Sequence, residues 1–368
     1  MIKIGIDCEN LEDSKSRWGI GHLVLSLLKE YAQNSEWKNK YKLYLYFKRG
    51  IPKDDIFNDP IFEKKVIARS LPSFNIYYHL FLPLAAYRDH INIMFFPAYM
   101  LPPLYIKRSI VTLTEDLFYE IKKGSLPFRY KLAYSLFSNW AATAAWKILA
   151  FSESSKQEVA KLFKVNPDRV IAAHLGVEKK NISTENKYGD YILYVGQMFP
   201  RRSAKELIKG FGLIADKYPD LKLILVGKDK YPKETIKPLV EKINSDLGSE
   251  RIIHHEYIVS DTEVHTLMAH AKALAYISSH EAFGLPPVEA ALYGTPVIVK
   301  NSLLNHEIFG DNALFIDDES NLMEIGSAIE KVVDDQELVT KFKTGYVKIG
   351  ERFSWKKFAE KFFSSLDA

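Results

Sequence analysis

The stretch SSHEAFGLPPVEAALYGTPVIVK, residues 278–300, constrains the fold of this chain more than any other segment. It starts after one apolar run, residues 273–277, and ends in another, residues 296–299; both have the length and side chains of buried strands. Between the runs, Pro286-Pro287 is placed to begin a helix and Gly294 to end it. The order strand, loop, short helix, strand predicts a parallel α/β sheet. The loop would leave the carboxyl end of a strand, where such sheets bind ligands.

Two carboxylates make this stretch a candidate ligand site. Glu281 falls in the loop before the prolines, and Glu289 falls in the first turn of the expected helix. The start of a helix offers unpaired N–H groups and a positive dipole end, which both favour phosphate. The segment could therefore hold an anion, hydrogen-bond hydroxyl groups and bring a carboxylate to a reacting centre. The alternative is that both glutamates are ordinary solvated residues.

Strands and helices alternate along both halves of the chain. A polar segment, residues 178–190, separates the halves and is the best linker candidate. Ser155 with Glu158, and Ser203 with Glu206, have the spacing of a capping box at the start of a helix. Each half is therefore predicted to be a doubly wound parallel sheet. The expected strands are residues 2–6, 41–47, 65–68, 91–96, 109–113, 147–151 and 170–174, then 191–195, 221–226, 251–255 and the two runs above.

Composition limits the class of function. The chain has 368 residues, enough for two domains, and 47% of them are hydrophobic. A net charge of +4 is too small to indicate a nucleic-acid-binding protein, although it suits a ligand that carries phosphates. One cysteine, Cys8, leaves no internal disulfide and fits a reducing compartment. Because no signal peptide or membrane-spanning run is visible, we expect a cytoplasmic protein.

A second candidate site is the loop GQMFPRRS, residues 196–203, which leaves one expected strand and enters a helix. Arg201 and Arg202 lie at the start of that helix, and Lys205 follows closely. Guanidinium groups stay charged and bind phosphate oxygens bidentately. Cations at a helix N-terminus oppose the helix dipole, which disfavours the alternative that these are only solvated surface charges.

Two features of the first half allow more than one interpretation. Gly19 and Gly21 would let the backbone approach a ligand at the start of a helix, or they form only a tight turn. They lack the third glycine of a dinucleotide-binding fingerprint. Residues 73–90 and 128–147 are rich in aromatic and basic side chains, which favours either a membrane-facing surface or a packed core.

The segment EAFGLPPVEA, followed by GTPVI, resembles the motif of retaining glycosyltransferases in which seven residues separate two glutamates, especially that of their family 4. GQMFPRR is similar to the phosphate-binding segment of that family, and IGID, WGIGH, VTLTED, FSESSK, HLGVE and FSW extend the resemblance to nearly the whole chain. The resemblance implies the GT-B fold, in which two Rossmann-like domains face a shared cleft. Residues 1–178 plus 353–368 would form the acceptor-binding domain, and residues 179–352 the nucleotide-sugar-binding domain.

The resemblance also implies roles for individual residues. Glu281 would bind hydroxyls of the donor sugar near the anomeric carbon. Arg202 would hold the diphosphate, helped by Arg201 or Lys205. Glu289 would bind the ribose of the nucleotide. Further expected contacts are the amides of Phe283, Gly284 and Leu285, the glycines Gly19 and Gly21 on the opposing wall, and residues 257–259 at the base.

Three positions depart from the family pattern. Gln197 stands where many members have arginine, and Arg202 where they have lysine, so one cation is missing and one is exchanged. Glu115 replaces a histidine that is thought to touch the donor sugar, while the following Asp116 is kept. Glu115 could accept hydrogen bonds from sugar hydroxyls, but it cannot replace an imidazole.

The expected function is therefore a retaining hexosyltransferase that works on a nucleotide-diphosphate sugar and builds cell-surface polysaccharide. GDP-mannose is slightly favoured as donor over UDP- or dTDP-sugars. The acceptor would be a glycan or a lipid-linked sugar, with peripheral contact at the inner face of the membrane. No Asp-x-Asp occurs in the chain, so we expect no metal and no cofactor besides the donor. The alternatives are a nucleotide-sugar-binding protein without turnover and a nicotinamide-dependent dehydrogenase.

Overall fold

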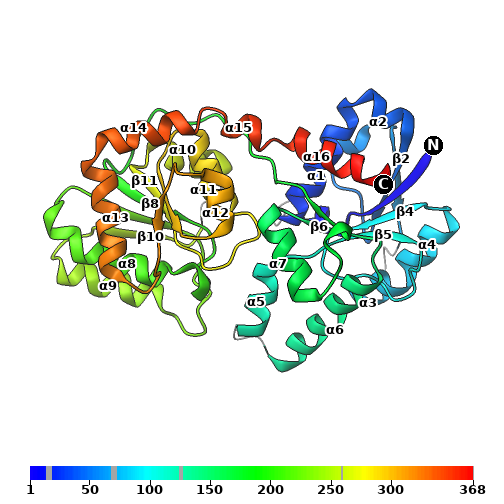
Figure 1. Ribbon diagram of the computed structural model, residues 1–368, viewed down its shortest axis with the longest axis horizontal. Helices are drawn as coiled ribbons and strands as arrows, with labels where there is room; N and C mark the ends of the chain where they lie inside the picture. The colour runs from blue at the N-terminus through cyan, green and yellow to red at the C-terminus, as the bar shows by residue number, and fades with distance from the viewer. Residues whose placement is uncertain (14–18, 68–72, 124–126, 258–259, 368) are drawn as a thin grey trace. The chain divides into compact units, whose positions relative to one another are not determined.

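The chain folds into two compact units (Figure 1). The computed structural model describes residues 1–13, 19–67, 73–123, 127–257 and 260–367. One unit comprises Met1–Gly176 and Trp355–Ala368, and the other comprises Val177–Ser354. These limits lie two residues from the expected ones at 178 and 353.

In the described part of the chain, the first unit is built on a seven-stranded parallel sheet with the order β3-β2-β1-β4-β5-β6-β7. Its strands are β1 (Ile2–Asp7), β2 (Tyr41–Phe47), β3 (Phe62–Val66), β4 (Ile93–Phe96), β5 (Arg108–Thr112), β6 (Lys147–Ala150) and β7 (Val170–Ala172). Its helices are α1 (Ile20–Gln33), α2 (Ser35–Lys40), α3 (Phe74–Ile76), α4 (Leu82–Arg88), α5 (Glu115–Lys123), α6 (Phe128–Ala144), α7 (Glu153–Phe163) and α16 (Trp355–Ser364). A π-helical turn, Tyr77–Phe81, joins α3 to α4.

The second unit is built, within the described residues, on a six-stranded parallel sheet with the order β10-β9-β8-β11-β12-β13. Its strands are β8 (Tyr191–Val195), β9 (Lys222–Val226), β10 (Ile252–His255), β11 (Ala273–Tyr276), β12 (Val297–Lys300) and β13 (Leu314–Ile316). Its helices are α8 (Ala204–Ile214), α9 (Ile236–Asp246), α10 (Asp261–His270), α11 (Leu285–Leu292), α12 (Leu303–Phe309), α13 (Leu322–Asp334), α14 (Gln336–Gly345) and α15 (Ile349–Arg352). Helix α8 packs against α9 and α13, and α10 packs against α11.

Both sheets confirm the predicted doubly wound class. In each sheet, the first strand of the unit is an interior strand. The next two strands of the chain lie on one side of it, and the later strands lie on the other side. The order therefore reverses between β1 and β4 in the first unit and between β8 and β11 in the second. Loops that leave neighbouring strands at such a point turn to opposite faces of the sheet, and the gap between them is the usual ligand site of this fold class.

The last helix belongs to the first unit because its apolar face packs there. The rings of Trp37 and Phe363 stack at 4.6 Å, and those of Tyr41 and Phe363 at 5.4 Å. At Gly176, a Cβ atom would lie 2.2 Å from the backbone nitrogen of Trp355, so only glycine lets these two segments touch. The buried residues of α16 are Trp355, Phe358, Ala359, Phe362 and Phe363, at the spacing of one helix face.

Two predicted helix caps are wrong. Ser203 does precede α8, but it has a φ of 51° and its side chain caps nothing. The cap of α7 is Ser152, whose side chain accepts a hydrogen bond from the backbone N–H of Ser155. Ser155 itself lies inside the first turn and donates to Glu115 instead. Both serines have the spacing of a capping box, but a tertiary partner takes the hydroxyl of Ser155, and Ser203 adopts a left-handed backbone conformation.

No helix in the described part of the chain is both long enough and apolar enough to cross a membrane.

Candidate functional site

The candidate site of the second unit begins where β8 ends. The chain leaves the strand at Gly196, whose φ is 137°, and its N–H donates to the carbonyl of Val226 on β9. At Gly227 a Cβ atom would lie 2.0 Å from the carbonyl oxygen of Gly196. Glycine is therefore required at position 227 for the two strand ends to stay together, and this close contact fixes the start of the 196–203 loop.

This loop brings two arginines to the loop that follows β11. A 3-10 turn, Pro200–Arg202, is closed by a hydrogen bond from the Arg202 N–H to the carbonyl of Phe199. The carbonyl of Arg201 then accepts a hydrogen bond of 2.9 Å from the N–H of Ser279. The loops that leave β8 and β11, the two strands at the reversal point of the sheet, are thus joined by their backbones.

Both arginines pair with Glu281. The guanidinium of Arg202 donates from Nε to Glu281 Oε1 at 2.7 Å and from Nη2 to Oε2 at 3.2 Å. Arg201 donates from Nη1 to Oε1 at 3.2 Å. Tyr276 and Ser278 donate their hydroxyl hydrogens to the same Oε1 at 3.1 and 3.0 Å. The structure therefore brings together three predicted residues, Glu281, Arg201 and Arg202, and adds two that the sequence did not indicate.

Aromatic rings enclose the arginines. The guanidinium of Arg202 lies 5.7 Å from the ring centroid of Phe199 and 5.4 Å from that of Tyr276. Arg201 lies 5.1 Å from the ring of Phe199. Tyr194 stacks on Tyr276 at 6.0 Å. Rings at these distances attract a cation and limit its movement, so the guanidinium planes are held as well as paired.

The charges of this cluster stay fixed at neutral pH. Burial would raise the pKa of Glu281, but the positive charges of Arg202 and Arg201 outweigh it and hold that pKa below its ordinary value. The side chains of Arg201, Arg202 and Glu281 are only 12%, 16% and 12% exposed. The two guanidinium groups thus face one carboxylate, which leaves an excess of positive charge where the two loops meet. Such a surface favours an anion.

Helix α11 follows directly and begins as predicted. Gly284 is its N-cap with a φ of 80°, and prolines occupy its first turn. Phe283 is buried, and its ring meets that of Phe353 edge-on at 5.5 Å. Gly294 ends the helix with a φ of 78°. The expected amide donors Gly284 and Leu285 are therefore the N-cap and the first residue of α11, and Phe283 directly precedes them.

Glu289 lies in the second turn of α11, so the expectation that it falls in the first turn is wrong, because the helix already begins at Leu285. Burial raises the pKa of its carboxyl group to about 7, the charge of Asp261 adds to this, and Lys180 opposes it. Among the described residues, no donor hydrogen-bonds to this carboxylate. The neighbouring Tyr293 fixes Lys180 by accepting from its backbone N–H at 2.8 Å. A half-buried carboxylate with unused acceptor capacity suits the predicted contact to hydroxyl groups.

A cation that the sequence did not indicate lies beside Gln197. Gln197 is exposed. The parallel pairing of β8 with β9 continues beyond the strands to a bridge between Met198 and Asp229. In this register Lys228 lies opposite Gln197. The ammonium of Lys228 lies 4.5 Å from the ring of Tyr257, which is 65% exposed. No carboxylate within the described ranges forms an ion pair with Lys228. The predicted base contacts at 258 and 259 lie outside the described residues.

Lys205 lies in the first turn of α8, and its backbone N–H donates to the hydroxyl of Tyr231 at 3.4 Å. The backbone of this residue is thus tied to the loop that follows β9.

Four predicted residues lie in the first unit. Gly19 is the N-cap of α1 with a φ of 63°, and Gly21 is buried in its first turn. Glu115 and Asp116 begin α5, just after β5. Glu115 is only 7% exposed and accepts a hydrogen bond of 2.5 Å from the hydroxyl of Ser155, and burial raises the pKa of its carboxyl group to about 7. Its described partner is thus a serine of α7.

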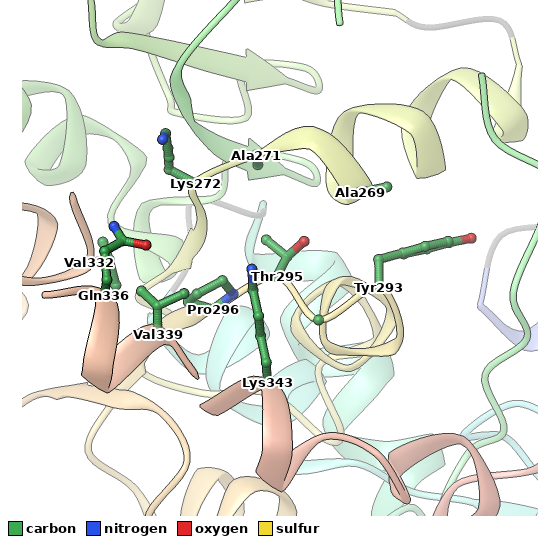
Figure 2. Close-up of a pocket in the computed structure, with 11 residues that line it drawn as sticks. Ala269, Ala271, Lys272, Tyr293, Thr295, Pro296, Val332, Gln336, Val339 and Lys343 are labelled. Atoms are coloured by element: carbon green, nitrogen blue, oxygen red, sulfur yellow. The ribbon is translucent and has the colours of Figure 1, made fainter. Parts of the chain in front are cut away.

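A small cavity of about 150 Å³ lies at the amino ends of strands β11 and β12, whereas the arginine pair lies beyond the carboxyl ends of the strands (Figure 2). It is lined by residues that precede β11 and β12, together with Lys343, which reaches toward the loop of Thr295. The helices α10, α11 and α13 all end there. Lysines at helix C-termini stabilise the negative ends of the helix dipoles, and this explains Lys272 and Lys343 without a ligand. None of the predicted site residues lines this cavity.

No group of three or more histidine, cysteine, aspartate or glutamate side chains suited to a metal ion occurs within the described residues.

Residues 177–346 match the family described as Glycosyl transferases group 1, and this range covers nearly all of the second unit. Over this range the chain is similar to glycosyl transferases of group 1. The match contains both loops of the site, from Gly196 to Glu289.

Curated relatives match part of the chain. The O-antigen chain mannosyltransferase RfbU of Salmonella typhimurium is 29% identical over 189 residues, which are 51% of this chain and 52% of the relative. The O-antigen chain mannosyltransferase B of Escherichia coli is 28% identical over 226 residues, which are 56% of this chain and 57% of the relative. The chain thus spans about half the length of these relatives.

Solved structures share the fold over the whole chain. WaaG, a glycosyltransferase involved in lipopolysaccharide biosynthesis, has a TM-score of 0.71 at 14% identity and covers 98% of both chains. Anabaena HepE, solved in complex with UDP and glucose, has a TM-score of 0.68 at 15% identity and covers 100% of both chains. The fold is therefore that of GT-B glycosyltransferases.

Sequence reasoning missed Phe199, Tyr276, Ser278, Lys228 and Ser155. Tyr276 was not predicted as a site residue, because an aromatic residue at the end of a buried strand is normally part of the hydrophobic core. Lys228 could have been found from the expected strands, because aligning 191–195 with 221–226 in a parallel pair sets it beside Gln197.

Proposed function

We propose that this protein is a retaining hexosyltransferase that moves a sugar from a nucleotide-diphosphate donor to a glycan or lipid-linked acceptor. The observation that carries the proposal is the cluster of Arg201, Arg202 and Glu281 at the reversal point of the second sheet. Fixed cations at that point suit a diphosphate, and the group 1 family match supports a sugar as the transferred group.

The chemistry of such a transfer needs positive charge near the leaving group. When the bond between the sugar and the phosphate breaks, the diphosphate gains negative charge and the anomeric carbon becomes positive. Arg202 and the amides at the start of α11 would bind the diphosphate oxygens, and their fixed positions would favour the transition state. We propose that the leaving phosphate itself takes the proton of the acceptor hydroxyl, on the face where the new bond forms. The configuration of the anomeric carbon would then be retained.

The donor is proposed from the relatives. Two relatives at 28–29% identity are named mannosyltransferases of O-antigen chains, which supports mannose as the transferred sugar and a cell-surface polysaccharide as product. GDP-mannose is the donor that we propose. We propose that no metal takes part, because guanidinium groups and helix amides can supply the positive charge that a divalent cation would otherwise bring.

A protein that binds nucleotide sugars without turnover is the second candidate. It is favoured by Gln197, which carries no charge, and by Glu115, whose carboxyl group is buried against Ser155. The dehydrogenase alternative explains neither the arginine pair nor Glu281.

One assay separates these candidates. The protein is incubated with GDP-mannose, UDP-glucose and dTDP-rhamnose, each with and without EDTA, and released nucleoside diphosphate is measured. Release that is unaffected by EDTA, with a product of unchanged anomeric configuration by NMR, supports the transferase. Tight binding without any release supports the second candidate.

A surface of the first unit supports a membrane-linked acceptor. Four apolar side chains of α6, namely Phe128, Leu132, Leu136 and Trp140, recur at every fourth residue and are 77%, 48%, 64% and 40% exposed. The opposite side of α6 is held in the unit, where Tyr134 is buried. Arg129 and Lys131 flank the start of this apolar ridge. Apolar and basic side chains together suit an anionic membrane surface. In residues 73–90, by contrast, Tyr77 and Tyr78 are buried core residues.

We therefore expect the protein to sediment with anionic liposomes at low salt. Leu132→Glu combined with Leu136→Glu should remove most of this binding, while Leu303→Glu, at a position 76% exposed in the second unit, should not. Sedimentation of both variants like the wild type, or of none of the three proteins, would exclude α6 as a membrane-binding surface.

A further inference from the structure

The hydrogen bonds of Glu281 to protein donors leave its carboxylate little acceptor capacity for a sugar. Its Oε1 accepts from Arg201, Arg202, Tyr276 and Ser278 at distances from 2.7 to 3.2 Å, and its Oε2 accepts from Arg202 at 3.2 Å. A carboxylate oxygen has about two lone-pair sites, so Oε1 has no capacity left. The bonds of this carboxylate are thus directed to the protein, and mainly to the two arginines.

Arg202, by contrast, keeps donors for a ligand. An arginine has five N–H donors in a fixed fork. Within the described part of the structure, Arg202 uses Nε and one hydrogen of Nη2 for Glu281, and one hydrogen of Nη1 for the carbonyl of Gln197 at 3.2 Å. Two N–H groups remain, one on each terminal nitrogen. Because the fork is planar, pairing one edge with Glu281 sets the direction of the remaining donors.

We propose that Glu281 is a positioning residue, which acts on the donor diphosphate through Arg202 rather than mainly through the sugar. This inference rests on the proposed function. A free arginine side chain would lose its rotamer freedom when it binds phosphate. Here the carboxylate and the rings of Phe199 and Tyr276 hold the guanidinium before the donor arrives. Position 202 holds arginine where many family members have lysine. This fits the proposed role, because an ammonium group cannot form the two-point contact with the carboxylate of Glu281.

The two roles of Glu281 predict different binding. If it positions Arg202, then Glu281→Gln weakens the binding of GDP and of GDP-mannose by the same factor, about 10- to 100-fold. If it mainly holds the sugar, only GDP-mannose binds more weakly, and GDP binds as before. Both affinities are measured by calorimetric titration. Glu330→Gln, which removes another ion-paired glutamate of the second unit, serves as the matched control and should leave both affinities unchanged.

A double-mutant cycle tests whether the effect passes through Arg202. In an Arg202→Met background, Glu281→Gln should change the affinity for GDP by less than about twofold, because the group it positions is absent. Equal losses in both backgrounds would overturn the proposal. Thermal melting of each variant shows whether it is folded. Should Glu281→Gln not fold, Arg202→Lys is used, and a loss confined to GDP-mannose would overturn the proposal.

The outcomes also separate this inference from the function on which it rests. The same titrations are run with UDP and UDP-glucose, so that the nucleotide is not assumed. If the wild type binds neither pair, the proposed function fails and the inference fails with it. If the wild type binds a pair and Glu281→Gln loses only the sugar nucleotide, the function stands and the positioning role is wrong.

Discussion

At the scale of single residues, the carboxyl group of Glu289 gives the proposed nucleotide site a pH dependence. Burial first, and then the charge of Asp261, raise its pKa to about 7 against the opposing charge of Lys180. The group is therefore neutral below that pH and charged above it. A carboxylate accepts stronger hydrogen bonds from ribose hydroxyls than a neutral carboxyl group does. Because the folded-state pKa is raised above 4.5, this group's contribution to stability is lost as pH rises through about 7.

We predict that the affinity for GDP-mannose rises about tenfold between pH 6 and pH 8, as Glu289 loses its proton. GDP-mannose is the suitable probe because neither of its phosphates is a terminal group with a second ionisation near neutral pH. Glu289→Gln should bind more weakly at pH 8 and show a flat profile. Calorimetric titration across this range measures both, and a variant that keeps the wild-type slope would remove Glu289 from the nucleotide contact.

Lys228 is a second residue-scale candidate, because it lies opposite the uncharged Gln197 and has no described carboxylate partner. We predict that Lys228→Ala weakens GDP-mannose binding about three- to tenfold and reduces its dependence on salt. Lys230→Ala, an exposed lysine of the same loop, is the matched control. If the two variants bind alike at every salt concentration, Lys228 makes no contact with the donor.

At the scale of elements, some local structure followed from the sequence and some did not. Helix α11 was predicted because prolines at its start and glycine at its end act locally. The caps at Ser155 and Ser203 were predicted wrongly, because Ser155 is taken by Glu115 and Ser203 adopts a left-handed backbone. Strand β13 (Leu314–Ile316) was not among the expected strands.

The site depends on the close contact between the ends of β8 and β9, because this contact fixes the start of the 196–203 loop. We predict that Gly227→Ala lowers the free energy of unfolding by at least about 2 kcal/mol, because its Cβ would meet the Gly196 carbonyl oxygen at 2.0 Å. Gly248→Ala is the control, since it also has a positive φ but no atom within 4 Å of the added Cβ. Denaturant melting compares them, and equal midpoints would mean that the strand ends can separate without cost.

At the scale of the whole molecule, the alternation of strands and helices was enough to predict two doubly wound sheets, and the structure confirms this class. The strand order was not in the sequence pattern itself, although it decides which loops meet. Arg202 and Glu281 are 79 residues apart, and they touch because β8 and β11 are neighbours at the reversal point. The partners Tyr276 and Ser278 could not be foreseen, since their role depends on side-chain distances that spacing does not give.

The central claim is that a diphosphate leaves from a sugar against Arg202. The measurement that tests it most directly is the rate at which nucleoside diphosphate is released from GDP-mannose, UDP-glucose and dTDP-rhamnose by the wild type and by Arg202→Ala. We predict release from at least one donor, and a fall of about 100-fold or more in the variant, which remains folded by thermal melting. Release by Arg202→Ala at the wild-type rate would contradict the claim.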